Sequence, residues 1–286
     1  MRKCIICNTD KEDSDFNEEH IIPAILGNKT FTIRNVCTTC NSLMGSKLIA
    51  PLSERDFVVS FRKRHNLKGN SGKQAKYKRL TTSKDGIKVV RNQEGQIEIG
   101  PQVQDIEGGF VVIGSNPEKL QKIAEAKERK AERKWEYQIE EKILEVTFSH
   151  ELDCRFILAY IAVCYETMFY LFGYDYLNDS VAKELQSILY NYLYHEQKMP
   201  AIQIRELDPD IAKIFFSEFH GDKNSVMVAL SFDETSVGAI FIIDGISLLD
   251  LRVGNNAGMG YGSGYLILAL EDGHIAKFDP DYIAPQ

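Results

Sequence analysis

The sequence lacks an apolar run long enough to cross a bilayer. The nearest candidate, Phe156 to Phe172, is interrupted by Glu166 and falls short of the ~20 residues that a spanning helix needs. We therefore expect a buried core helix there and no membrane partner. The sequence Met1-Arg2-Lys3 leads directly into Cys4 without an apolar signal segment. We therefore expect a cytoplasmic location.

A net positive charge is also absent. The formal net charge is −7, which argues against a general nucleic-acid binder. The charge is unevenly distributed, however: residues 47–91 hold thirteen Lys or Arg against three Asp or Glu, whereas residues 201–286 hold five against thirteen. The basic stretch could neutralise the phosphates of a bound nucleic acid through Arg62, Lys63, Arg64, Lys76, Lys78 and Arg79. A solvated, partly flexible linker is the alternative, because Asn66 to Gly72 is rich in Gly, Asn and Ser.

Cysteine is scarce, but its placement is informative. Four of the six cysteines form two Cys-x-x-Cys pairs, Cys4 with Cys7 and Cys37 with Cys40. Two such pairs can close on one Zn²⁺, and a site filled by four sulfurs leaves no position for water or substrate. We therefore predict a structural zinc that stabilises a segment too short for an apolar core of its own. Buried thiols without metal are the alternative; the remaining Cys154 and Cys164 are expected to stay reduced.

The segment between the pairs places a carboxylate directly before a histidine. Glu18-Glu19-His20-Ile21-Ile22-Pro23 reads as a short extended run that Pro23 ends. After the second pair, Asn41 opens a segment whose apolar spacing turns helical. The predicted order is strand, turn, strand and helix around zinc, a ββα unit.

This order and the string Glu-His-Ile-Ile-Pro resemble the HNH endonucleases, the ββα-metal nucleases, and in particular their branch with a Cys₄ zinc. The resemblance covers roughly residues 1–55. It implies that His20 is the general base, that Glu19 and Asn41 hold a catalytic divalent ion, and that Asn35 steadies the histidine. Asn28, at the turn, competes with Asn35 for the last role. The resemblance also implies a role in restriction or phage defence.

The residue types suit phosphodiester hydrolysis on chemical grounds. An imidazole with a pKa near 6.5 is a workable base at neutral pH. One carboxylate and one amide oxygen would bind Mg²⁺ or Mn²⁺ and leave coordination places for water and phosphate. A zinc ligand or a purely structural histidine is the alternative for His20.

The rest of the chain predicts an α+β fold. Short strands are expected near 87–90, 97–99 and 110–114, and helices over 118–134, with Asn116 as N-cap, 150–173 and 179–195. The carboxy-terminal third is β-rich, with apolar runs at 215–216, 226–230, 239–243 and 265–270. The glycine-rich segment 254–264 lacks the Lys-Ser/Thr ending of a P-loop and is interpreted as a turn or a mobile loop.

We predict three parts: a nuclease module at 1–55, a basic linker with short strands at 56–105, and an α+β domain at 106–286 that chooses the substrate, regulates the nuclease or joins subunits. The predicted function is a metal-dependent endonuclease that hydrolyses DNA, with structural Zn²⁺ and catalytic Mg²⁺ or Mn²⁺. A non-cleaving zinc module that binds nucleic acid or a protein partner is one alternative. An RNA nuclease is another, because a site that faces phosphates does not distinguish the sugars. A cut in both strands would suggest a homodimer or two successive nicks.

Overall fold

The computed structural model divides the chain into two compact units. One unit is Met1–Ala75 together with Leu152–Gln286, and the other is Lys76–Glu151. The described residues are 1–69, 72–76, 87–91, 96–132, 134, 154–202, 204–205, 226–243, 246–247 and 250–278. Lys78, Arg79 and the predicted strand at 215–216 lie outside them.

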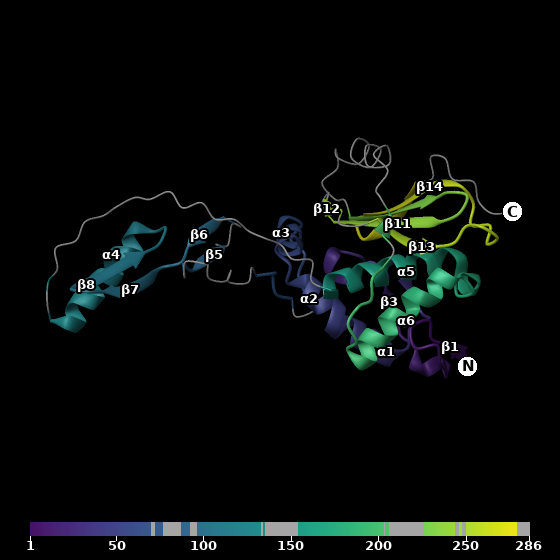
Figure 1. The fold of residues 1–286 in the computed structure, drawn as a ribbon, viewed down its shortest axis with the longest axis horizontal. Coiled ribbons are helices and arrows are strands. Elements are labelled where there is room, and N and C mark those ends of the chain that lie inside the picture. The colour runs from purple at the N-terminus through teal and green to yellow at the C-terminus, as the bar shows by residue number, and fades with distance from the viewer. Residues whose placement is uncertain are drawn as a thin grey trace. The chain divides into compact units, whose positions relative to one another are not determined.

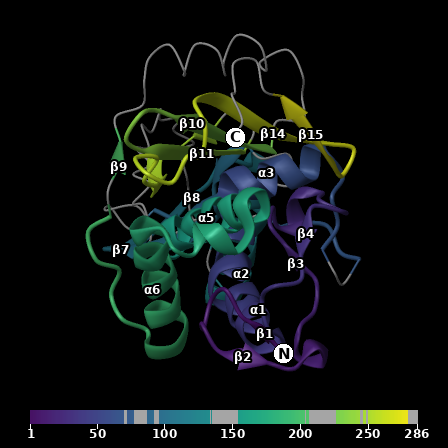
Figure 2. The same cartoon turned by 90° about the vertical axis from the view of Figure 1, so that its right-hand side faces the viewer.

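The centre of the first unit is the apolar helix α5 (Cys154–Tyr176). A carboxy-terminal sheet packs on one side of this helix and the amino-terminal module on the other (Figures 1 and 2). In the described part of the chain α5 alone has the length and hydropathy of a membrane span, but 72% of its most apolar window is buried inside the protein. It is therefore the buried core helix that the sequence predicted. The expectation that it falls short of a spanning length is wrong, because the helix continues beyond both Phe156 and Phe172 to 23 residues. The helix breaks at Gly173, whose φ of 60° and ψ of −143° are not helical.

The sheet is antiparallel, with the strand order β15-β14-β10-β11-β13-β9 and β12 paired to β11. Its central strands alternate their side chains between two buried faces: Val226, Val228 and Leu230 join the core around α5, while Met227 and Ala229 join a second cluster. The strands are β9 (Ile204–Arg205), β10 (Val226–Phe232), β11 (Val237–Ile243), β12 (Ile246–Ser247), β13 (Asp250–Gly254), β14 (Gly264–Glu271) and β15 (His274–Phe278).

The amino-terminal module is made of short elements. In chain order they are β1 (Arg2–Lys3), β2 (Asp10–Lys11), η1 (Asp13–Asp15), β3 (Glu19–His20), η2 (Ala24–Leu26), β4 (Thr32–Ile33), α1 (Thr38–Met44), the π-helical turn η3 (Gly45–Ile49), α2 (Ala50–Ser53) and α3 (Asp56–Arg64). The start of the predicted basic linker is thus helical, because Val58, Val59 and Phe61 give α3 an apolar face that is buried.

Helix α6 (Ser180–His195) follows α5 and begins at the N-cap Asp179. The buried Asp179 carboxylate accepts hydrogen bonds from Val181 N at 2.8 Å, Asn255 N at 2.7 Å and the Tyr261 hydroxyl at 3.1 Å. The cap therefore also anchors the glycine-rich segment, which forms a turn region between β13 and β14 as predicted.

The described residues of the second unit form two hairpins and one helix. They are β5 (Val89–Arg91) with β6 (Ile97–Ile99), β7 (Gln102–Ile106) with β8 (Gly109–Ile113), and α4 (Pro117–Ala131), which packs on β8. The predicted N-cap is confirmed, because Asn116 Oδ1 accepts a hydrogen bond from Lys119 N at 3.0 Å.

The α+β fold class is confirmed: a small amino-terminal module with four clustered cysteines, central helices and a carboxy-terminal antiparallel sheet. The boundaries of the two compact units differ from the domain boundaries predicted at 55/56 and 105/106. The reason is that the module shares one apolar core with α5, α6 and the sheet. The three-part functional division itself stays a prediction.

Candidate nuclease site

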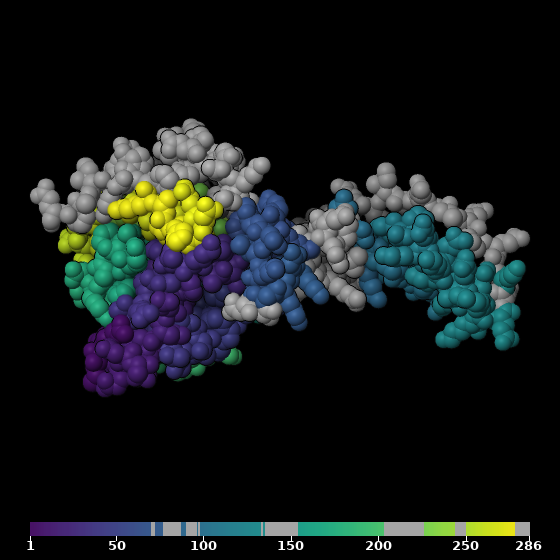
Figure 3. Space-filling model, turned by 180° about the vertical axis from the view of Figure 1, so that it is seen from behind, coloured from purple at the N-terminus to yellow at the C-terminus, as the bar shows by residue number. Residues whose placement is uncertain are grey.

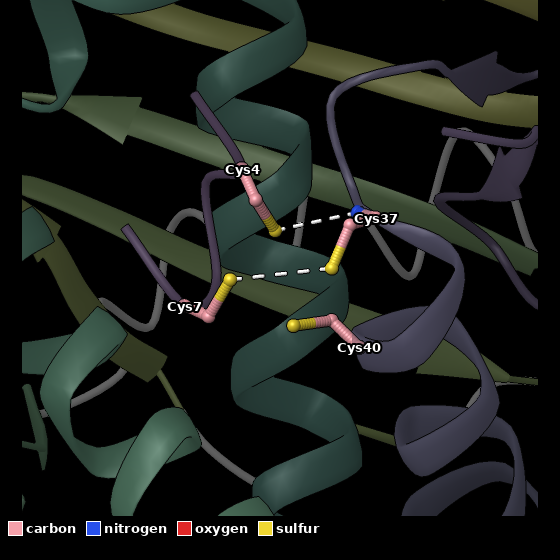
Figure 4. A group of neighbouring side chains, drawn as sticks. All are labelled: Cys4, Cys7, Cys37 and Cys40. Carbon is pink, nitrogen blue, oxygen red and sulfur yellow. Dashed lines mark hydrogen bonds between the residues drawn. The ribbon is translucent and has the colours of Figure 1, made fainter. Parts of the chain in front are cut away.

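Four cysteines converge at one end of the module. The Sγ atoms of Cys4, Cys7, Cys37 and Cys40 all lie within 4.8 Å of one another, and those of Cys7 and Cys37 are 4.0 Å apart (Figure 4). Tetrahedral zinc with Zn–S bonds of about 2.3 Å would place its sulfurs about 3.8 Å apart. The four predicted ligands therefore form a cluster whose size and chemistry fit a structural zinc.

Local backbone structure brings the two pairs together. The first pair lies on a tight turn that Asn8 ends with a φ of 55°, while Asn8 N donates to Cys4 O at 2.9 Å. Cys37 is the N-cap of α1, and its backbone N–H donates to Cys4 Sγ at 3.3 Å. A hydrogen bond from the Cys40 thiol lowers the pKa of Cys4 to about 5, and the same bond raises the pKa of Cys40. Without metal, the cluster thus favours one thiolate, and the other thiols must lose protons when zinc binds.

Helices α5 and α6 hold the first cysteine pair, Cys4 and Cys7, in place. The Tyr165 hydroxyl of α5 donates to Ile5 O at 2.8 Å, and the Gln186 amide of α6 donates to Ile6 O. The Tyr194 hydroxyl lies 3.2 Å from Cys40 Sγ. The sequence analysis missed these three residues, because their partners are more than 150 positions away in the chain.

The predicted ββα unit is present. Glu19 and His20 form β3, which pairs with β4 through Glu19↔Ile33 and His20↔Thr32, and α1 follows. Two hydrogen bonds tie α1 to the start of β3: the Thr38 hydroxyl donates to Asp15 O at 2.7 Å, and Asn41 Nδ2 donates to Glu18 O at 3.0 Å. Asn41 therefore lies beside the Glu18–Glu19 peptide, and its Oδ1 remains the atom that could bind a cation.

His20 has a feature that a plain structural histidine rarely shows. Its ring is half-buried, and Nδ1 is buried with no hydrogen-bond partner among the residues that the structure describes. Buried polar atoms are normally paired, so an unpaired ring nitrogen marks a group held for another partner.

Glu19 points into the protein and is only 8% exposed. Burial raises the pKa of Glu19 to about 8. A second buried carboxyl group, Glu166 of α5, is 1% exposed, and burial followed by the nearby charge of Glu19 raises its pKa. Within the described ranges no ion pair joins either carboxyl group to Lys or Arg, so these two buried carboxyl groups suit a cation with oxygen ligands.

The sequence did not predict that Glu166 is coupled to Glu19, although a signal was present. It is the single charged residue between Phe156 and Phe172, and an isolated acid inside a core helix usually has a specific reason to be there.

The structure gives Asn35 and Asn28, the two candidates for the residue that steadies His20, different hydrogen-bond partners. Asn35 Nδ2 donates to the Tyr174 hydroxyl at 2.9 Å, so its amide faces α5. Asn28 is buried in the loop between β3 and β4, where Nδ2 donates to Ile22 O at 2.6 Å and to Phe31 O at 2.9 Å. The Asn28 side chain thus closes the loop that carries His20.

The basic residues differ in their accessibility. Arg62 is only 6% exposed, Lys63 is half-buried and Arg64 is exposed at the end of α3. Lys76 is exposed but belongs to the second unit. Because a buried guanidinium cannot reach a phosphate in this conformation, Arg64 is the best-placed of the described candidates in the first unit.

Comparison with known proteins addresses the module alone. The HNH endonuclease family model matches residues 4–57, which include all four cysteines, β3, β4 and α1. No curated protein and no solved structure matches the chain. On the family match and the four-cysteine cluster, this chain carries an HNH endonuclease domain at residues 4–57 and is a phosphodiester hydrolase acting on nucleic acid.

Proposed function

We propose that the protein is a metal-dependent DNA endonuclease in which His20 is the general base and Glu19 and Asn41 hold Mg²⁺ or Mn²⁺. The observation that carries this proposal is the junction of β3 and α1. There Asn41 Nδ2 donates a hydrogen bond to the Glu18 carbonyl. Glu19 then supplies a buried carboxylate, and His20 supplies an imidazole with an unpaired ring nitrogen.

The reaction follows from these groups. Neutral His20 takes a proton from a water molecule, whose oxygen attacks phosphorus in line with the 3′ oxygen. The bond from phosphorus to the 3′ oxygen then breaks, that oxygen takes a proton from water and leaves as a hydroxyl, and His20 returns its proton to solvent. A divalent ion bound by Glu19 and Asn41 would supply positive charge for the phosphate and the leaving oxygen. The four cysteines take no part in these steps, because their zinc would have no open position.

The setting of the enzyme is also part of the proposal. Reduced thiols are needed to bind zinc, and all six cysteines are unpaired, which supports a cytoplasmic location. A role in restriction or phage defence rests on the resemblance to the family alone. A homodimer would let one complex cut both strands.

Cleavage of supercoiled plasmid tests the activity. Zinc-loaded wild type should nick or linearise DNA with Mg²⁺ or Mn²⁺, whereas His20→Ala should be at least about a hundredfold slower, as is typical when a general base is removed. His195→Ala is the matched control, because His195 is exposed at the end of α6.

Three results would contradict the proposal in different ways. Equal rates for wild type and His20→Ala would remove the assigned base. Cleavage of RNA but not DNA would establish the RNA nuclease. Tight nucleic-acid binding with no cleavage of either polymer would establish the non-cleaving zinc module.

A further inference from the structure

The turn between β3 and β4 contacts the turn between β14 and β15, more than 240 residues away in the chain. Lys29 N donates to Gly273 O at 2.9 Å, and Lys29 Nζ donates to Asp272 O at 3.0 Å. The Thr30 hydroxyl lies 3.5 Å from Gly273 O and 3.2 Å from His274 Nδ1. In Figure 3 the yellow end of the sheet lies directly against the purple amino-terminal module.

This contact falls on the hairpin that carries His20. From Lys29 and Thr30 the chain continues through Phe31, whose carbonyl accepts from Ile21 N at 3.2 Å, to Thr32, which pairs with His20. Asn28 closes the same loop from inside. Each β-strand of this hairpin is two residues long, so its own ladder provides little rigidity.

The β14–β15 turn is shaped for the contact. Asp272 and Gly273 have φ values of 50° and 90°, and such consecutive positive values form the tight two-residue turn that Asp-Gly favours. A Cβ on Gly273 would lie 2.7 Å from both Cγ and Cδ of Lys29. Glycine at this position thus serves the approach of the two turns as well as the backbone conformation.

We infer that the β14–β15 turn is a positioning element of the nuclease domain: Gly273 and the adjacent backbone hold the β3–β4 hairpin, and through it His20, in the geometry that catalysis requires. Gly273, the backbone N–H of Lys29 and the Thr30 hydroxyl position the hairpin and touch no substrate. The inference rests on the proposed function for its effect on rate, while the ordering of the hairpin is measurable without any cleavage.

Gly273→Ala tests the inference against Gly258→Ala. Gly258 also has a positive φ, 81°, but a Cβ there would meet no atom within 4 Å, so the two variants share backbone strain and differ in the contact. Gly273→Ala should lower kcat by up to about tenfold with KM unchanged, because the added Cβ must displace the Lys29 side chain or the turn that carries it, and a small misplacement of a catalytic group slows the reaction. Gly258→Ala should keep the wild-type kcat.

Removing the obstructing side chain should restore the activity. In the double variant Lys29→Ala with Gly273→Ala, the added Cβ has room, and most of the lost kcat should return. Thr30→Val provides a second test if Gly273→Ala does not fold; it removes only the hydroxyl contacts and should lower kcat by about fivefold, the value of one ordinary hydrogen bond.

Amide hydrogen exchange of the peptide covering residues 28–33 reads the ordering directly. We expect faster exchange in Gly273→Ala, wild-type exchange in Gly258→Ala, and recovery in the double variant. If wild type cuts no nucleic acid but this exchange pattern appears, the proposed function fails and the positioning contact stands. The inference is overturned by unchanged exchange in both Gly273→Ala and Thr30→Val, or by faster exchange without loss of kcat in an active enzyme.

Discussion

Two buried carboxyl groups give the site its acid–base character at the scale of single residues. Glu19 lies on β3 and Glu166 on the core helix; burial disfavours ionisation of both, and the charge of Glu19 further disfavours ionisation of Glu166. A buried carboxyl group of this kind keeps its proton when no metal cation is present, and it loses the proton when a metal cation binds to it.

The pH dependence of stability should reveal this preference. Because the pKa of Glu19 is raised from 4.5 to about 8, the stabilising effect of its bound proton is complete below about pH 4.5 and is lost as pH rises through about 8. We expect the thermal midpoint, measured without Mg²⁺ and at pH values where the thiolates keep their zinc, to fall as pH rises through about 8. Glu19→Gln should flatten the fall, with the remaining slope coming from Glu166.

Divalent ions should reverse the trend in wild type. Binding of Mn²⁺ displaces the proton from Glu19, so affinity should increase up to about pH 8 and stabilise the protein most at the alkaline end. Titration calorimetry at several pH values measures this directly. Equal Mn²⁺ affinity in Glu19→Gln and wild type would show that Glu19 is not a ligand.

At the scale of elements, α3 changes the interpretation of the basic segment. Its apolar face is buried, so the helix is part of the folded unit, and its last turn carries Arg62, Lys63 and Arg64. Burial separates Arg62 from solvent and also lowers the pKa of Arg62, while Arg64 remains exposed. The helix thus presents selected cations to solvent instead of a uniformly basic tail.

Arg64→Ala should weaken DNA binding by a sequence-independent amount and reduce the slope of log affinity against log salt by about one. Fluorescence anisotropy with a labelled duplex at several salt concentrations would measure both effects. Lys198→Ala is the control, because Lys198 is exposed in the segment after α6. A salt slope that is the same in both variants would exclude Arg64 from the DNA contact.

At the scale of the whole molecule, the nuclease module and the carboxy-terminal helices form one folding unit. Phe57 packs edge-on against Phe156 at 5.7 Å, and Phe31 against Tyr170 at 4.8 Å. Tyr165 adds its hydrogen bond to the backbone of the first cysteine pair. The module therefore buries its apolar surface against α5 and does not depend on zinc alone.

Two truncations should separate these contributions. A fragment of residues 1–75 should stay largely unfolded even with zinc, because it lacks α5 and α6, whereas replacement of residues 76–151 by a Gly/Ser linker should leave the first unit folded. Circular dichroism, zinc content and plasmid cleavage report on each variant. A fully folded 1–75 fragment would show instead that the module is an independent domain.

Several features of this protein were predictable because local sequence determines them. The spacing of the two Cys-x-x-Cys pairs identifies the four cysteines that cluster, and the helices capped by Asn116 and Asp179 follow from side chains that bind their own backbone. The order strand, turn, strand, helix around His20 is likewise local, since β3, β4 and α1 lie within 26 residues of one another.

Only the tertiary structure decided which of these residues meet distant ones. No periodicity or spacing in the sequence identifies the partners in four of these interactions. They are the coupling of Glu166 to Glu19, the packing of Arg62 near Gly69, the hydrogen bond from Asn35 to Tyr174, and the contact of the β14–β15 turn with Lys29. The physical reason is that burial and charge coupling depend on which surfaces pack together. The sequence determined the parts of the nuclease site, and packing against α5 and the sheet determined their environment.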